Sequence, residues 1–171
     1  MKESDKGVQH SFLTFRVGEE EFASNVANVL EILEMPSITK IPHSPDYMRG
    51  VINLRGRVLP VLDTRKKFGI PAPEDDVDTS IIVLEINMGE RATEIGALVN
   101  SVEEVIELSE SDMEPAPNIG SKHKSDFIQG MVKREEKFTM VLDMNKVFSE
   151  SEIETTKSLT KNNREEVTID S

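Results

Sequence analysis

The chain has 171 residues and no cysteine, which excludes disulfide and thiolate chemistry and agrees with a reducing cytosol. Its formal net charge of −12 would repel a phosphate backbone, so general binding to nucleic acid or anionic membranes is not expected. The longest apolar run, Ile81 to Leu84, is far too short to span a bilayer, and we expect a soluble, intracellular protein.

The N-terminal part of the chain has the alternation of short strands. Residues 1–10 are polar and are expected to be disordered. Residues 11–17 place apolar side chains on one face, and a Gly-Glu turn leads into a second strand over 20–23. The segment Val26 to Met35 has a spacing that fits both a helix and a strand. We favour a short helical turn that continues into a strand.

The most informative stretch is a hairpin followed by a short helix. Between residues 51 and 62, two apolar, β-branched runs flank Arg55-Gly56-Arg57, which has the composition of a turn. Asp63 is placed to cap a helical turn that Gly69 ends. Pro60 lacks the N–H that a central strand donates, so the second strand is expected to be an edge strand or to carry a bulge.

Positive charge is concentrated around this hairpin. From Lys40 to Lys67 there are seven basic residues against two acidic ones, a local balance of +5, so the rest of the chain carries −17. A basic stretch in an acidic protein predicts one specific partner surface. The alternative is that each of these side chains is a solvated turn residue.

A proline-rich, acidic connector over residues 70–78 precedes a second strand-rich unit. Two alternating segments meet there at a turn over residues 88–90, and the segment 102–108 has the pattern of 26–33. A loop is expected over residues 109–125.

The hairpin recurs with a constant offset of 80 positions, which indicates a two-fold internal repeat. The aligned pairs need no gap and include His43/His123, Asp46/Asp126, Tyr47/Phe127, Gly50/Gly130, Asp63/Asp143 and Phe68/Phe148. Short, regularly spaced strands in two copies indicate two small barrels, which we expect to share an apolar interface. We place the folded domain at 11–149, as two interleaved units with approximate halves 11–70 and 79–149. The polar segment 150–171 is expected to be a tail or a frayed helix.

No constellation typical of catalysis or metal binding stands out. His43 and His123 occupy equivalent repeat positions, which more often share a structural role than form one metal site, and His10 lies in the polar N-terminal segment. The acidic runs 74–78 and 103–114 resemble solvated loops and lack the spacing of a calcium loop. We therefore expect no active site, no metal and no cofactor.

The two hairpin tips differ most between the copies. Asn53 to Arg57 is compact, glycine-containing and basic, whereas Lys133 to Lys137 is wholly charged. Because two copies of one unit share what the fold needs, this difference suggests that Leu54 and Arg55 recognise a partner with carboxylates and apolar side chains. The alternative is that Gly56 only supplies a positive φ and that Arg55 is solvated.

These residues carry a resemblance to a known family, the CheW-type chemotaxis coupling proteins, over roughly residues 11–149. Its motifs are Pro45-x-x-Met-Arg-Gly-Val-Ile-Asn-Leu-Arg-Gly-x-x-Leu-Pro-Val-Leu-Asp63, Phe12-x-x-Phe-x-Val-Gly-x-Glu-x-Phe22, Val29-x-Glu-Ile32 and Pro115-Ala-Pro117. The resemblance implies a mainly β fold, with two SH3-like five-stranded β-barrels packed around a shared core and short helical turns. It also implies a non-enzymatic chemotaxis adaptor that couples chemoreceptors to the histidine kinase CheA in a signalling array.

The resemblance further implies two binding surfaces. The family's receptor-binding groove lies between the barrels, and its positions carry over onto Val29, Glu31, Gly50 and Arg55, with Asn53 and Leu54 adjacent. For the kinase surface the sequence suggests Val58, Ile81 and Ile82. The implied partners are the CheA regulatory domain and the cytoplasmic hairpin tip of chemoreceptors, with no nucleic acid and no membrane insertion. The implied location is cytoplasmic, at membrane receptor arrays through protein contacts.

Other functions stay open at this point. One alternative is a coupling protein for an array that controls pili or development and not flagella, and another is a stand-alone relative of the kinase regulatory domain. SH3-like barrels can also bind nucleic acid, but the charge and the scarcity of aromatic residues argue against it. Arg57, Lys66, Lys67 and the segment after Ser149 lie outside the motifs and are candidates for selecting one receptor or kinase.

Overall fold

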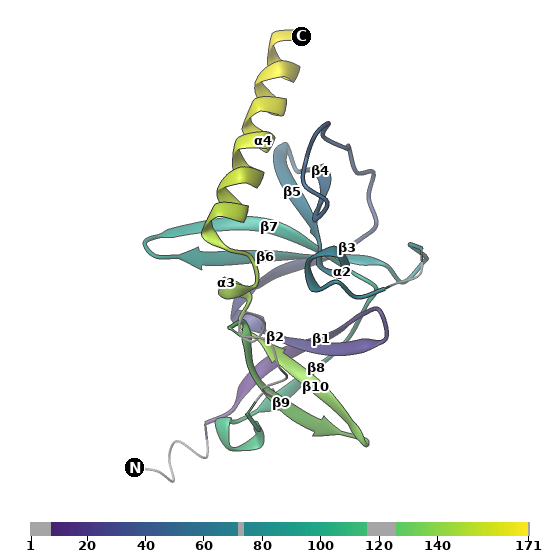
Figure 1. Ribbon diagram of the computed structural model, residues 1–171, viewed down its shortest axis with the longest axis vertical. Helices are drawn as coiled ribbons and strands as arrows, with labels where there is room; N and C mark the ends of the chain where they lie inside the picture. Colours follow the sequence, from purple (N-terminus) through teal and green to yellow (C-terminus); the bar gives the residue numbers. More distant parts are fainter. Residues whose placement is uncertain (1–7, 72–73, 116–125, 171) are drawn as a thin grey trace.

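The computed structural model describes residues 8–71, 74–115 and 126–170, and these residues form two five-stranded sheets that lie one above the other (Figure 1). One sheet has the order β8-β1-β2-β10-β9, with β8 (Ser101–Leu108), β1 (His10–Val17), β2 (Glu20–Asn25), β10 (Lys137–Leu142) and β9 (Ile128–Arg134). The other has the order β3-β6-β7-β5-β4, with β3 (Val29–Glu34), β6 (Ser80–Met88), β7 (Arg91–Val99), β5 (Arg57–Asp63) and β4 (Met48–Leu54). The helices are η1 (Val26–Asn28), α2 (Thr64–Phe68), η2 (Glu110–Asp112), α3 (Met144–Val147) and α4 (Glu150–Asp170). The predicted mainly β fold of two five-stranded units is confirmed.

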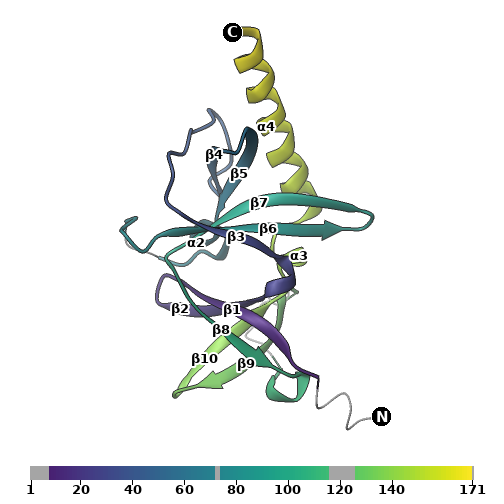
Figure 2. The ribbon, with the colours of Figure 1, turned by 180° about the vertical axis from the view of Figure 1, so that it is seen from behind.

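Each sheet combines strands that are distant in the sequence. The N-terminal hairpin β1–β2 joins the second repeat hairpin through the parallel pair β2–β10. The hairpin β6–β7 joins the first repeat hairpin through the parallel pair β5–β7. Figure 2 shows β1 and β2 beside β9 and β10, below the sheet that contains β6 and β7. The two barrels are therefore interleaved along the chain.

The internal repeat is visible in the backbone. β4 and β9 each have seven residues and begin at Met48 and Ile128, which are 80 positions apart. The caps are also repeated, because Asp63 accepts a hydrogen bond from the N–H of Arg65 at 2.9 Å and Asp143 accepts one from Asn145 at 3.0 Å. The predicted helical turn after each hairpin is confirmed as α2 and α3.

The two copies meet in a shared core that contains side chains from both sheets. Phe68, which ends α2, stacks on Phe127 of the other copy with ring centroids 5.4 Å apart. The symmetry-related pair is Phe148 and Tyr47, with centroids 6.3 Å apart. Each barrel also has a smaller core of its own, around Val61 in the second sheet and Val141 in the first. The expected shared apolar interface is confirmed.

The hairpin tips have the same shape despite their different sequences. Leu54 pairs with Arg57, so the first turn has two residues, Arg55 and Gly56, with φ of 52° and 84°. Glu135 and Glu136 form the equivalent turn of the second hairpin with φ of 49° and 70°. Arg57 therefore belongs to β5 and not to the turn, which corrects the predicted three-residue turn. The tips differ in charge, not in backbone conformation.

Pro60 does not mark an edge strand, because β5 lies between β4 and β7. Its partner on β4, Val51, exchanges both backbone hydrogen bonds with Thr39 on the far side, at 2.8 and 2.9 Å. Consequently the nitrogen of Pro60 faces away from β4, and the parallel pairing with β7 starts only at Val61. The bulge in this hairpin lies in β4, between Met48 and Gly50.

The basic stretch does not form one positive surface, which corrects that prediction. Arg65 is buried and donates to both oxygens of Asp63, at 2.9 and 3.1 Å, and to Asp75 at 3.0 Å. Arg49 contacts the same two carboxylates. Asp75 was expected in a solvated loop, but its ion pairs fasten the acidic connector to α2. Ion pairs also neutralise Arg55, Arg57 and Lys67.

Several other segments either agree with the predictions made from the sequence or lie partly outside the described residues. Val26 to Met35 is the predicted helical turn and strand, now η1 and β3. Of the N-terminal segment expected to be disordered, residues 1–7 lie outside the description, and His10 already pairs with Leu108. The expected loop after Ser109 begins with η2, and its residues 116–125 also lie outside.

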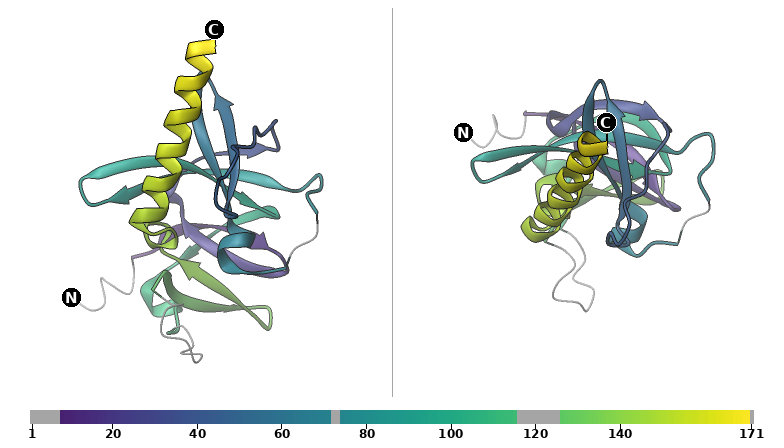
Figure 3. Two further views of the ribbon diagram at one scale, coloured as in Figure 1. Left: turned by 45° about the horizontal axis from the view of Figure 1, so that its top comes forward. Right: turned by 90° about the horizontal axis from the view of Figure 1, so that it is seen from above.

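The polar C-terminal segment is a long helix, α4, which runs beside the β4–β5 hairpin and extends beyond it (Figures 1 and 3). Ser149 and Glu152 form a capping box at its start, with reciprocal bonds of 3.1 and 2.8 Å. Lys67 of α2 binds the Glu152 carboxylate at 2.8 Å. Ile153 is 1% exposed and packs in the shared core. Of the two predicted alternatives, a tail and a frayed helix, the structure shows a helix, and its few apolar residues include one that packs in the core.

Gly50 offers a first test of the fold. A Cβ at this position would lie 2.3 Å from the carbonyl oxygen of Thr39, whereas a Cβ at Gly56 would meet nothing within 4 Å. We expect Gly50→Ala to lower the free energy of unfolding by about 3 kcal/mol through overpacking. Gly56→Ala should cost about 1 kcal/mol through its positive φ alone. Urea unfolding of both variants measures the difference, and equal losses would contradict the packing argument.

The Asp75 carboxylate predicts a dependence of stability on pH. Its partial burial would raise its pKa, but hydrogen bonds from Arg65 and Arg49 outweigh burial and lower the pKa below its ordinary 3.8. The stabilisation is therefore complete above that value and is lost as the pH falls through the lower folded pKa. Asp75→Asn should reduce the free energy of unfolding at pH 7 by about 1 kcal/mol.

The difference between Asp75→Asn and the wild type should shrink below about pH 4. Asp78→Asn, at an exposed position of the same connector, is the matched control and should leave the profile unchanged. Urea unfolding at pH 7, 5 and 3 provides the measurement. A difference that persists undiminished at pH 3 would show that the charge of Asp75 is not the cause.

Candidate functional site

An exposed ion pair joins the tip of the first hairpin to β3. Arg55 contacts Glu31, with one Nη1 to Oε2 distance of 3.5 Å, and the two side chains are 66% and 30% exposed. β3 and β4 are the two edge strands of their sheet, so the pair connects its opposite edges where the barrel closes. Two of the six predicted receptor-site residues are thus brought together at the surface.

Two residues that the sequence reasoning did not select lie on either side of Glu31 along β3. Leu30 and Ile32 are each 46% exposed. The sequence contains a signal for this exposure, because the run Val29 to Ile32 has apolar residues on both faces of a strand. When only one face of such a strand packs against the core, the apolar residues of the other face are exposed. The side chains of Leu30 and Ile32 alternate with that of Glu31, so β3 presents a charged pair on one face and exposed apolar side chains on the other. Exposed apolar side chains on an edge strand can take part in a protein interaction surface.

The other predicted receptor-site residues are less exposed. Val29 is half-buried against the shared core, and Leu54 is 6% exposed within the second barrel. Asn53 accepts a hydrogen bond from the N–H of Gly56 at 2.8 Å and so shapes the turn. Gly50 permits the close approach of the chain's own Thr39. The side of Gly50 on which a side chain would lie is therefore covered and is not open to a partner. In this structure these residues position Arg55 and Glu31.

The residues suggested for the kinase surface separate into two groups. Ile81 and Ile82 are 0% and 1% exposed in β6, which is an internal strand. Their side chains cannot contact a partner directly, and that part of the prediction is corrected. This short apolar run is buried on both faces, because the shared core covers the face of Ile82 and the barrel core covers the face of Ile81. Val58 is half-buried and remains accessible.

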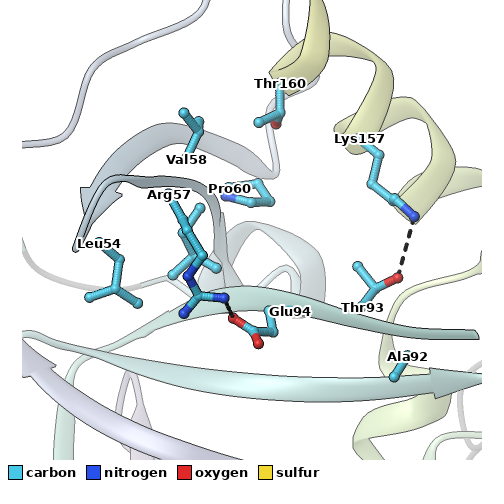
Figure 4. A pocket seen from close by; sticks show the side chains of 10 residues that line it. Leu54, Arg57, Val58, Pro60, Ala92, Thr93, Glu94, Lys157 and Thr160 are labelled. Carbon is cyan, nitrogen blue, oxygen red and sulfur yellow. Dashed lines mark hydrogen bonds and ion pairs between the residues drawn. The ribbon is translucent and has the colours of Figure 1, made fainter. Parts of the chain in front are cut away.

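Val58 lies in a groove of about 460 Å³ between the first hairpin, β7 and α4 (Figure 4). Its apolar lining includes Leu54, Leu59 and Pro60. Arg57 donates to Glu94 at 2.7 Å on one side. Among the residues that the structure describes, no cluster of His, Asp and Glu could hold a metal ion. Within the same described residues, no helix is long and apolar enough to cross a membrane.

The sequence as a whole matches a known family model. The CheW-like domain matches residues 11–152, which is most of the chain. The chain belongs to this CheW-like family. Among curated CheW-like relatives, a chemotaxis protein CheW from Rhizobium meliloti is 35% identical over 142 residues, covering 83% of this chain and 89% of the relative. One from Bacillus subtilis is also 35% identical, over 135 residues, covering 79% and 84%.

A solved CheW structure has the same fold as this CheW-like chain. The scaffolding protein TtCheW from Thermoanaerobacter tengcongensis is 32% identical, with a TM-score of 0.72 that covers 83% of this chain and 94% of that structure. The family match ends at Glu152, so nearly all of α4 lies outside it. The Arg55–Glu31 pair lies within the match, whereas the α4 side of the groove does not.

The Arg55–Glu31 pair should contribute little to stability. Both side chains are partly exposed, and exposed ion pairs usually contribute about 0.5 kcal/mol. A double-mutant cycle with Arg55→Ala and Glu31→Ala, followed by urea unfolding, should therefore give a coupling energy below about 1 kcal/mol. A much larger coupling would assign the pair to closing the barrel and not to an interaction surface.

Proposed function

We propose that this chain is a non-enzymatic chemotaxis adaptor that couples chemoreceptors to the histidine kinase CheA in a signalling array. Membership in the CheW-like family and several relatives named chemotaxis protein CheW support this role. The work of such an adaptor is binding, so it needs two separate protein surfaces and no reactive group.

The observation that carries the proposal is the exposed surface on β3 and the hairpin tip. It consists of the Arg55–Glu31 pair on one face of the edge strand β3 and of two half-exposed apolar side chains, Leu30 and Ile32, on its other face, and we name this set the receptor surface. The guanidinium of Arg55 can donate several hydrogen bonds to carboxylates of a helical partner. The flanking apolar side chains would supply the buried area. This chemistry suits the cytoplasmic hairpin tip of a chemoreceptor.

The proposed second surface surrounds Val58 on the outer side of β5 and would contact the regulatory domain of CheA. Its lining residues come from the hairpin, β7 and α4 and include none of the four residues of the receptor surface, so a receptor and a kinase would contact different residues. Through these two contacts the protein would be held in the cytoplasm at membrane receptor arrays. The surface has both apolar and charged lining residues, as protein interfaces commonly do.

Reversing the charge of Arg55 tests the receptor surface. Arg55→Glu would place two carboxylates together and should weaken binding to a purified receptor cytoplasmic fragment by about 2 kcal/mol or more. Far-UV circular dichroism and binding to the kinase regulatory domain should be unchanged, because the side chain is 66% exposed and distant from the core. Affinities from titration calorimetry provide the measurement.

Lys137→Glu is the matched control, since it makes the same charge change beside the equivalent turn of the second hairpin. It should leave receptor binding unchanged. Receptor binding by Arg55→Glu at wild-type affinity would overturn the assignment of this surface. Equal weakening by the two variants would assign the effect to net charge instead.

A further inference from the structure

The groove beside Val58 has one wall that is outside the family match. Lys157 and Thr160 line it from α4, opposite the hairpin residues Leu54 and Val58 (Figure 4). The family match ends at residue 152, before either of these α4 residues. The groove therefore combines a floor built by the family fold with a wall that the C-terminal helix adds.

The helical wall is held firmly enough to shape a site. Ile153 and Thr156 are 1% and 0% exposed, so the first turns of α4 are packed on the body of the protein. Thr160 donates to the carbonyl oxygen of Thr156 at 2.8 Å, and Thr156 donates to that of Glu152 at 2.9 Å. Because both hydroxyls are satisfied within the helix, their methyl groups can pack as apolar surface. The position of Lys157 follows from this packing.

The charges around the groove are unequal. The guanidinium of Arg57 is balanced by Glu94, at 2.7 Å. The ammonium of Lys157 contacts the hydroxyl of Thr93 at 3.5 Å, and within the described residues it has no carboxylate partner. The groove thus presents an apolar floor with one uncompensated positive charge at its rim. An occupant with a carboxylate beside an apolar side chain complements both features.

The size of the groove suits side chains of a partner. The groove holds about 460 Å³ and is open on one side, so it can receive an apolar side chain together with a neighbouring carboxylate. The proposed function assigns the surface around Val58, which includes this groove, to the regulatory domain of CheA, and that domain is the occupant considered.

We propose that this groove docks a loop of the CheA regulatory domain that carries an apolar side chain next to a carboxylate, and that Lys157 of α4 selects for that carboxylate. The inference rests on the proposed function and adds a specific site to it. It gives α4 a role in partner choice, since a chain without this helix would have the floor of the groove but not its charged wall.

Filling the groove is the first test. Ala92 is an exposed groove residue on β7, and Ala92→Trp should weaken binding of the full-length chain to the purified kinase regulatory domain by about a hundredfold. Ser158→Trp, at an exposed position of α4 outside the groove, is the matched control and should bind within about twofold of the wild type. Binding of the receptor fragment should not change for either variant.

Reversing the charge at the rim is the second test, and it does not alter the size of the groove. Lys157→Glu should weaken kinase binding by about tenfold, with the loss reduced at high salt. Lys133→Glu, an equal change at an exposed position of the other barrel, should have no effect. Thermal unfolding of each variant verifies that the fold is intact.

The outcomes separate this inference from the proposed function. If the wild type binds the kinase domain and Ala92→Trp and Lys157→Glu bind equally well, the groove is not the docking site and the inference fails alone. If the two variants weaken receptor binding or self-association instead, the occupant is a different one and the inference also fails. If the wild type binds no kinase domain, the proposed function fails with it.

Discussion

The fold depends on contacts between aromatic side chains of its two repeat copies. Phe68 at the end of the first copy packs on Phe127 at the start of the second copy. The equivalent contact in the other direction joins Phe148 of the second copy to Tyr47 of the first. Each barrel encloses only a small core of its own, which would be marginal for so short a unit. The shared core supplies the remaining apolar burial and fixes the barrels relative to one another. It also holds the start of α4, because Ile153 packs in it.

Closure of the second barrel determines the receptor surface. The side chains of Arg55 and Glu31 meet because β3 and β4 are the first and last strands of a sheet that curls on itself. Gly50 is required for the same closure, since the segment around Thr39 lies directly against its backbone. Residues that a family motif groups together therefore have two kinds of role. Some build the barrel, and others are presented by it.

Individual ion pairs, and not the net charge, determine the electrostatic character of each surface in this acidic chain. Most cations of the basic stretch are bound by carboxylates, and several of these come from distant parts of the sequence, such as Glu94 for Arg57 and Glu152 for Lys67. Net charge and charge runs say little about a surface once such pairs form, because a paired cation has a short-range field. A cation beside apolar surface that has no carboxylate partner among the described residues, as Lys157 beside the groove, is more informative than a larger cluster of paired cations.

The sequence by itself determined the class of fold, the repeat, the capped turns and the family, because strand alternation, turn residues and cap residues are local signals that recur at a fixed offset. It could also place Arg55 and Glu31 in one site through the family resemblance. Only the tertiary structure decided which apolar residues are buried: Ile81 lies in the core, whereas Leu30 is exposed, although both are apolar strand residues. It also decided that the polar segment 150–170 is helical and that its first turns pack on the body of the protein and form one wall of a groove. Burial and ion pairing depend on contacts between segments far apart in the chain, and the pattern within a segment does not specify them.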